Sequence, residues 1–143
     1  MIKMTSANIS WDQCFMHMAE TVSRRSKDPN TKVGAVIVSP GNNIVHIGYN
    51  GFPSGLEETR ERWDDKHSYV VHAEMNAVLN AKCDLDGWTL YTTMFPCCEC
   101  IKLILQTGIE KIVYNSESSR MLSGTIEQSK SLLKEMSVKI VRL

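Results

Sequence analysis

Three side chains in the middle of the sequence could bind a metal ion, and a fourth could move protons beside it. His72 is followed two positions later by Glu74, and Cys97 and Cys100 stand three positions apart, directly after Pro96. One imidazole and two thiolates supply three zinc ligands and leave a fourth position open for water, which distinguishes a catalytic zinc site from a closed structural one. Glu74 could act as the proton shuttle for such a water.

The order and spacing of these residues match a known chemical signature. H-x-E followed by P-C-x-x-C is typical of zinc deaminases, in which a metal-activated water attacks the amino-bearing carbon of a nucleobase. Both halves occur here, as H-A-E at 72–74 and P-C-C-E-C at 96–100. The alternative is a structural zinc knuckle or unligated core cysteines, which have no use for the glutamate. A thioredoxin-like redox pair fits less well, because it calls for no partner histidine and glutamate.

The remaining cysteines and histidines have weaker claims as ligands. Cys98 adjoins both candidate ligands, but adjacent positions of a helix point in different directions, so we interpret Cys98 as a bystander. Cys14 falls on the apolar face of an expected helix and Cys83 near the end of another. We therefore expect packing roles for these two. No ligand spacing is found around His17, His46 and His67.

Length and composition restrict the class of protein. A chain of 143 residues with 43% hydrophobic content fits one domain spanning 1–143. Sixteen basic and sixteen acidic residues give a net charge of zero, which argues against duplex DNA or long RNA as a partner. No apolar run approaches the roughly 20 residues that span a membrane, and residues 1–10 lack the apolar region of a secretory signal. We therefore expect a cytoplasmic, reducing compartment, in which cysteines serve as ligands and core residues.

Helical and strand patterns alternate along the chain and predict an α/β sandwich with partly parallel strands. Ser10 and Gln13 form a capping-box pattern that begins a helix at 11–25. Strands at 33–38 and 44–47, joined by a tight turn, predict an antiparallel hairpin. The segment 48–70 is too long for a plain connector, and such loops are usually functional. Further helices are expected at 72–82, 97–106 and 122–136, and further strands at 88–94, 109–114 and 138–143.

Sequence blocks that flank the zinc motif narrow the class further. They are R-S-K-D-P-N-T-K-V-G-A at 25–35, G-Y-N-G-F-P at 48–53, Y-V-V-H-A-E-M-N-A at 69–77 and F-P-C-C-E-C at 95–100. The zinc motif alone marks a wide superfamily of cytidine, guanine, tRNA-adenosine and polynucleotide-cytosine deaminases. With its flanks, the chain from about residue 11 onward resembles the deoxycytidylate (dCMP) deaminase family.

This resemblance implies a fold, a reaction and a set of partners. The fold is a three-layer α/β/α sandwich with a mixed five-stranded sheet, of the cytidine deaminase type. The reaction is zinc-dependent deamination of dCMP to dUMP, which feeds thymidylate synthesis. The implied assembly is a homohexamer, activated by dCTP and inhibited by dTTP, with Mg²⁺ accompanying a nucleoside triphosphate effector. None of this regulation follows from composition or spacing.

The resemblance also assigns roles to individual residues. His72, Cys97 and Cys100 look like the zinc ligands, and Glu74 looks like the proton shuttle. Asn50, in the loop after the second expected strand, looks like the contact to the sugar hydroxyl.

Other contacts to a nucleotide follow from chemistry as much as from resemblance. The backbone amide of Ala73 suits the base carbonyl. Arginine suits a phosphate, so Arg25 and Ser26 are the leading phosphate candidates, although a solvated helix end explains the same residues. Tyr114 is a weaker pocket candidate. Arg120 could bind phosphate or serve a subunit interface.

The resemblance implies an effector site around the loop at 48–53. Gly48, Tyr49 and Gly51 are its candidates, with Lys66, at the end of the charged segment 57–66, as the phosphate contact. The alternatives are a simple Asn-Gly turn and a solvated charged surface.

Two rival functions remain at this point. One is the same chemistry on another cytosine nucleoside or nucleotide, or on tRNA adenosine. Zero net charge weighs against tRNA, and the block beginning at Arg25 favours a phosphorylated mononucleotide. The other rival is a non-catalytic zinc-binding module.

Overall fold

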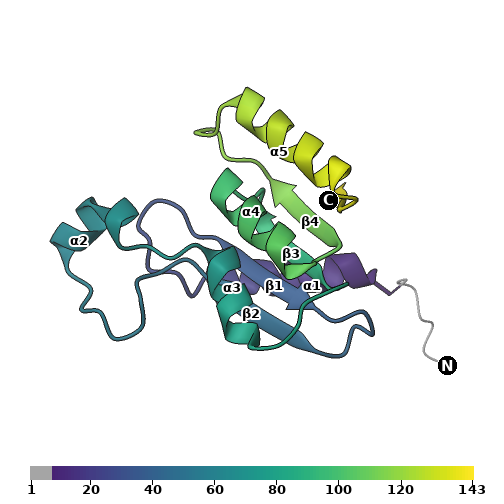
Figure 1. The fold of residues 1–143 in the computed structure, drawn as a ribbon. Coiled ribbons are helices and arrows are strands. Elements are labelled where there is room, and N and C mark those ends of the chain that lie inside the picture. The colour runs from purple at the N-terminus through teal and green to yellow at the C-terminus, as the bar shows by residue number, and fades with distance from the viewer. Residues whose placement is uncertain (1–7) are drawn as a thin grey trace.

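The structure, a computed structural model, describes residues 8–143. Residues 1–7, which belong to the segment expected to carry no secretory signal, lie outside the described part. Within residues 8–143, none of the helices combines the length and apolar character needed to cross a bilayer. The helices are α1 (Trp11–Ser23), α2 (Arg60–Asp64), the short 3₁₀ helix η1 (Lys66–Ser68), α3 (Ala73–Ala81), α4 (Cys98–Thr107) and α5 (Ser123–Glu135), and the strands are β1 (Gly34–Val38), β2 (Val45–Tyr49), β3 (Thr89–Met94), β4 (Lys111–Ser116) and β5 (Lys139–Arg142) (Figure 1).

The five strands form one mixed sheet in the order β2-β1-β3-β4-β5. β1 pairs antiparallel with both β2 and β3, whereas β3, β4 and β5 run parallel to one another. The predicted hairpin is therefore confirmed, and so is the predicted mixed five-stranded sheet.

Alternation along β1 shows how the layers are built. Ala35 and Ile37 pack into the core cluster shared with α3, α4 and α5. Val36 and Val38 face the opposite side and pack with Phe15 of α1. Because successive strand residues point to opposite faces, a strand buried along its whole length requires helices on both sides. The predicted α/β/α arrangement is confirmed.

Helix α1 begins where the sequence predicted. The Ser10 hydroxyl accepts a hydrogen bond from the Gln13 backbone N–H at 3.0 Å, and the Gln13 side chain accepts one from the Ser10 N–H at 2.9 Å. This capping box satisfies two N–H groups that would have no partner within the helix. The helix ends at Ser23, two residues earlier than expected, and the loop that follows approaches the site described below.

The long segment after β2 contains two short helices that the sequence did not predict, α2 and η1. Both helices belong to residues 52–70, which we call the 52–70 segment. Within this segment, α2 projects away from the sheet (Figure 1). An antiparallel bridge between Gly51 and Val71 closes its neck. Inside it, Phe52 stacks on Trp63 with ring centroids 4.3 Å apart and contacts Tyr69 at 5.8 Å. The segment thus has its own small aromatic cluster.

Close packing of α3 on β2 fixes where α3 begins. A Cβ atom placed on Gly48 would lie 2.4 Å from both the Ala73 carbonyl oxygen and the Ala77 nitrogen. Only glycine therefore allows the helix this close to the strand. This contact sets the position of the first turn of α3, which follows His72.

Candidate metal centre and active site

Two helix N-termini converge on one point and bring the three predicted ligands together. His72 is the N-cap residue of α3, and Cys97 is the N-cap residue of α4. Cys100 lies in the first turn of α4. The His72 Nδ1 atom is 3.5 Å from the Cys97 Sγ and 3.4 Å from the Cys100 Sγ. All three donor atoms lie within 4.8 Å of one another.

These separations fit a tetrahedral zinc ion. With Zn–S of about 2.3 Å and Zn–N of about 2.1 Å, tetrahedral angles place a sulfur and a nitrogen about 3.6 Å apart. The two Nδ1–Sγ distances, 3.5 and 3.4 Å, agree with this value. The donor set of one imidazole and two thiols is one that zinc prefers. The arrangement therefore suits a zinc ion held on three sides.

The two candidate thiols differ in acidity, and only Cys97 readily gives up its proton. A hydrogen bond from Cys100 and a second from His72 lower the pKa of Cys97 to about 4. The same hydrogen bond and burial raise the pKa of Cys100. The hydrogen bond to Cys97 raises the pKa of His72. Metal binding would displace these protons, because zinc takes thiolate and neutral imidazole as ligands.

Glu74 is buried beside the ligands rather than exposed on the helix surface. Its side chain belongs to the first turn of α3, and the residue is only 5% exposed. The Thr92 hydroxyl lies 3.2 Å from the Glu74 Oε1, on the adjacent strand β3. Burial raises the pKa of Glu74. A buried carboxyl group of this kind can hold and release a proton, as the sequence prediction requires.

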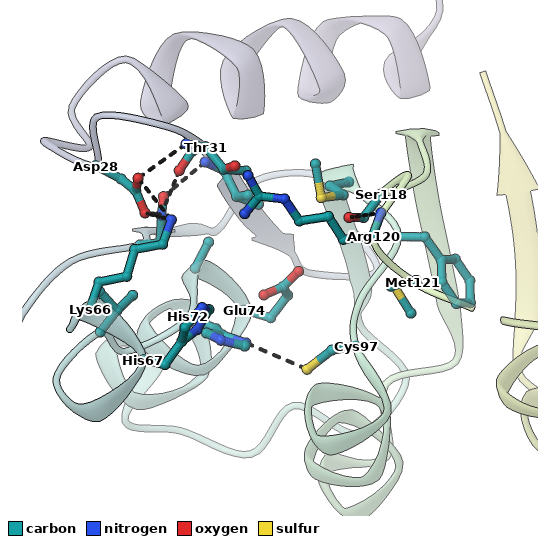
Figure 2. A pocket seen from close by; sticks show the side chains of 16 residues that line it. Asp28, Thr31, Lys66, His67, His72, Glu74, Cys97, Ser118, Arg120 and Met121 are labelled. Atoms are coloured by element: carbon teal, nitrogen blue, oxygen red, sulfur yellow. Dashed lines mark hydrogen bonds and ion pairs between the residues drawn. The ribbon is translucent and has the colours of Figure 1, made fainter. Parts of the chain in front are cut away.

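A cavity of about 260 Å³ opens in front of the metal-binding group (Figure 2). It is large enough for part of a nucleotide. Its lining includes seven residues that the sequence singles out as candidates for the site, namely Asn50, Lys66, His72, Ala73, Glu74, Cys97 and Arg120.

The Asn50 and Ala73 groups face this cavity as expected for substrate contacts. Asn50 is 6% exposed, and its Oδ1 accepts a hydrogen bond from the Val33 N–H at 2.8 Å. Ala73 is the first residue of α3, so its N–H has no partner within the helix. That N–H is available to a ligand carbonyl.

Three predicted nucleotide contacts do not line the cavity. Arg25 is exposed on the loop after α1. Ser26 is buried, and its hydroxyl donates to the Asn50 carbonyl oxygen at 2.8 Å. Tyr114 packs edge-on behind Phe95, a cavity residue, with ring centroids 5.0 Å apart. Ser26 therefore supports the Asn50 loop from behind.

The four effector candidates have different surroundings. Gly48 is covered by α3, and the Tyr49 carbonyl oxygen accepts a hydrogen bond from the Asn76 side chain at 2.8 Å. Gly51 forms the bridge at the neck of the 52–70 segment. Lys66 lines the cavity and forms an ion pair with Asp28 at 3.0 Å.

Sequence reasoning missed Asp28, Thr92 and His67, all close to the site. Asp28 and His67 line the cavity, and Thr92 contacts Glu74. No local signal distinguishes Thr92 from the other two threonines of β3, Thr89 and Thr93. Arg120 is the arginine that lines the cavity, although the sequence favours Arg25 over it as a phosphate contact. Figure 2 shows its side chain extending from the loop after β4 across the cavity toward Thr31.

Comparisons with known proteins agree with this geometry. Residues 9–116 match the family model "Cytidine and deoxycytidylate deaminase zinc-binding region". A probable deoxycytidylate deaminase of Caenorhabditis elegans is 45% identical over 117 residues, which cover 77% of this chain and 59% of that protein. The human deoxycytidylate deaminase is 43% identical over 118 residues, covering 76% of this chain and 66% of its own length.

A solved structure extends the comparison to the fold. The dCMP deaminase of cyanophage S-TIM5, in complex with dCMP and dUMP, superposes with a TM-score of 0.78 at 30% identity, covering 96% of this chain and 100% of the phage chain. The present chain spans about 60% to two thirds of the length of the nematode and human relatives. With the matched zinc-binding region, the converging ligands and the shared fold, the chain belongs to the cytidine and deoxycytidylate deaminase family.

Proposed function

We propose that this protein catalyses the zinc-dependent hydrolysis of dCMP to dUMP and ammonia. The observation that carries the proposal is the buried Glu74 carboxyl group, which faces the same cavity as the His72, Cys97 and Cys100 group. A structural zinc site has no use for such a neighbour. The choice of dCMP is supported by the names of the relatives and by the nucleotides bound to the phage protein.

The chemistry divides between the metal and the protein. A bound zinc ion supplies a Lewis acid that lowers the pKa of water from 15.7 to about 7. Glu74 takes up the proton that the attacking water loses, and delivers it to the ring nitrogen beside the reacting carbon. It then takes the second proton of the former water, from the hydroxyl group added to the carbon, and delivers it to the departing amine. Thr92 holds Glu74 in place through its hydroxyl.

Three groups are proposed to hold the nucleotide. The Ala73 N–H donates to the base carbonyl, and the Asn50 Oδ1 accepts from the sugar hydroxyl. Arg120 binds the phosphate, because it is a cation on the cavity wall and arginine suits phosphate geometry. Arg25 is the second candidate, on the neighbouring loop.

The finer properties rest on family resemblance alone. They are a cytoplasmic homohexamer acting in pyrimidine nucleotide metabolism, with activation by dCTP, inhibition by dTTP and Mg²⁺ accompanying the effector. Lys66 would have to leave its ion pair with Asp28 to bind an effector phosphate. These properties would be tested by sizing the protein and by measuring dCMP turnover with each triphosphate.

A substrate panel tests the proposed reaction. Zinc-loaded protein is incubated separately with dCMP, dCTP, deoxycytidine and a tRNA anticodon stem, and deamination is followed by the change in absorbance and by released ammonia. We expect dCMP to be converted fastest. Faster conversion of deoxycytidine or the tRNA stem would reassign the substrate, and no conversion of any of them would favour the non-catalytic module.

A further inference from the structure

Asp28 and Lys66 form a buried ion pair in the cavity wall. Because burying two charges costs desolvation energy, such a pair is not explained by stability alone. The Lys66 Nζ lies 3.1 and 3.0 Å from the two carboxylate oxygens of Asp28. The Asp28 side chain is 3% exposed and that of Lys66 is 12% exposed. The Asp28 Oδ1 also accepts from the backbone N–H groups of Asn30 and Thr31, at 2.8 and 3.1 Å. The carboxylate is thus bound both by two backbone N–H groups of its own loop and by the Lys66 ammonium.

This pair reaches the proposed substrate contact through Asn50. The Asn50 Nδ2 donates to the Thr31 carbonyl oxygen at 2.8 Å and to the Asp28 Oδ2 at 3.3 Å. Its Oδ1 accepts from the Val33 N–H at 2.8 Å. Both hydrogens of the Asn50 side-chain amide are therefore used. If the amide flipped, its NH₂ group would point at the Val33 N–H, so two donors would face each other. What remains for a ligand is one lone pair on Oδ1.

A group that can only accept selects a donor on the ligand. The sugar of a 2′-deoxynucleoside 5′-monophosphate carries a single hydroxyl, at the 3′ position. At neutral pH its ionised phosphate acts as a hydrogen-bond acceptor and not as a donor. The Asn50 Oδ1 is therefore matched to the 3′-hydroxyl and to no other atom of the sugar phosphate. The Asn50 Oδ1 can accept from the 3′-hydroxyl only while Asp28 binds the Asn50 Nδ2 group and so keeps it away from the ligand.

Lys66, which is distant from Asp28 in the sequence, supplies the positive charge that balances the Asp28 carboxylate. Lys66 belongs to η1, within the 52–70 segment, and its ammonium neutralises the carboxylate that orients Asn50. Without the ammonium, Asp28 would be a buried, uncompensated anion in a cavity that must admit an anionic substrate. The pair also joins the 52–70 segment to the cavity wall.

We propose that Asp28 and Lys66 are positioning residues, which fix the Asn50 amide as an acceptor for the 3′-hydroxyl of the substrate. This inference rests on the proposed deamination of dCMP and adds the origin of its sugar recognition. It gives Lys66 a role in the cavity wall that does not depend on an effector.

The test compares dCMP with its 2′,3′-dideoxy analogue, which lacks the 3′-hydroxyl. In the wild-type protein, we expect kcat/KM to be at least about tenfold higher for dCMP, the effect of one hydrogen bond in a buried site. Asp28→Asn places a second NH₂ group against the Asn50 Nδ2, and Lys66→Met removes the charge while keeping the stem. Each variant should reduce the preference for dCMP to less than about threefold. Lys66→Arg, which can still pair with Asp28, should retain it.

A matched control separates positioning from general destabilisation. Lys111 pairs with Asp12 at 3.1 Å, between β4 and α1 and outside the cavity lining. Lys111→Met should lower the melting temperature and leave the preference for dCMP unchanged. Zinc content and melting temperature are measured for every variant, and Lys66→Met carries the test if Asp28→Asn does not fold.

The possible failures are distinguishable. Equal rates on the two nucleotides in the wild type, or a full tenfold preference in folded Lys66→Met, would overturn the positioning role while dCMP deamination stands. Absence of dCMP turnover by the zinc-loaded wild type would overturn the proposed function and this inference with it.

Discussion

At the scale of single residues, two adjacent cysteines of the same motif have different surroundings. The Cys97 Sγ faces the imidazole of His72, whereas Cys98 is exposed and lies outside the metal-binding group. Adjacent positions at a helix start point apart, so only one of them can reach the metal.

We therefore expect Cys97→Ser to lose most of its bound zinc and Cys98→Ser to retain one zinc ion per chain. The serine hydroxyl that replaces the thiol is a poor zinc ligand at neutral pH. Cys98→Ser serves as the control, because it removes a thiol at the neighbouring position. Metal analysis of the two purified variants decides the matter. Equal zinc content in both would show that the ligand set has been assigned wrongly.

Site residues that are close together in the sequence could be predicted, whereas those that meet only in the folded chain could not. The ligands could be predicted because His72 and Glu74 are two residues apart and Cys97 and Cys100 three, so each spacing carries its own chemical meaning. Asp28 could not be found in this way. Its partner Lys66 stands 38 positions away, and the residues around Asp28 read as an ordinary turn.

The buried Asp28 also predicts a dependence of stability on pH. Burial raises its pKa, but the hydrogen bonds from Asn30 and Lys66 outweigh burial and lower the pKa below its usual 3.8. A lowered pKa means that the stabilising contribution is complete above pH 3.8 and is lost as the pH falls through the lower folded-state value.

Melting temperatures of the wild type and Asp28→Asn should therefore differ near neutral pH and converge in acid. Near neutral pH the variant leaves Lys66 without its partner, at a cost of roughly 3 kcal/mol. The comparison is made from pH 6 down to pH 2, and acid release of zinc affects both proteins alike. A gap that stays constant across this range would contradict a charged, stabilising Asp28.

At the scale of elements, the metal site depends on how closely α3 approaches β2. The helix carries Glu74 in its first turn and follows His72, so any displacement of α3 moves both groups. Gly48 is the residue that permits the approach.

Gly48→Ala should lower stability by about 1–3 kcal/mol, because its new methyl group overlaps the backbone of α3. Zinc affinity should fall with it, since His72 is carried by the same displacement. The control is Gly124→Ala in α5, where nothing lies within 4 Å of the added Cβ and alanine favours the helix. Thermal unfolding and zinc titration measure the two effects. A Gly48→Ala protein as stable as Gly124→Ala would refute the packing argument.

The elements that sequence predicted well are those with local signals. The capping box at Ser10 and the turn after β1 have defined side-chain chemistry, so α1 and the hairpin were found within about two residues. Helix α2 has five residues, no buried residue and a charged sequence, and it gave no periodic pattern. Its place depends on the stacking of Phe52 on Trp63, a contact between residues that are not neighbours in the sequence.

At the scale of the whole molecule, the site lies where the fold brings separate loops together. The parallel strands β3 and β4 end at the same edge of the sheet, and the residues after them, including Cys97 and Arg120, line the cavity. The loops after α1 and β2 add Asp28 and Asn50 from the antiparallel side. Loops beyond the carboxyl ends of parallel strands are a common place for ligand sites.

Since the metal would join residues from two helices, its removal should weaken the whole fold. Chelation should lower the melting temperature by several degrees, and added Zn²⁺ should restore it, because a ligand of the native state stabilises that state. Mg²⁺, which prefers oxygen ligands, should not restore it. An unchanged melting temperature after verified loss of zinc would mean that the metal is not bound at this junction.

The central claim, that Glu74 moves protons for a deamination reaction at this metal site, has one direct test. Wild-type protein and Glu74→Gln are prepared with equal, measured zinc content, and the conversion of dCMP to dUMP and ammonia is followed in each. We predict turnover by the wild type and a rate lower by about 10²–10⁴-fold in Glu74→Gln, with zinc retained. Undiminished turnover in zinc-replete Glu74→Gln, or none in the zinc-replete wild type, would contradict the claim.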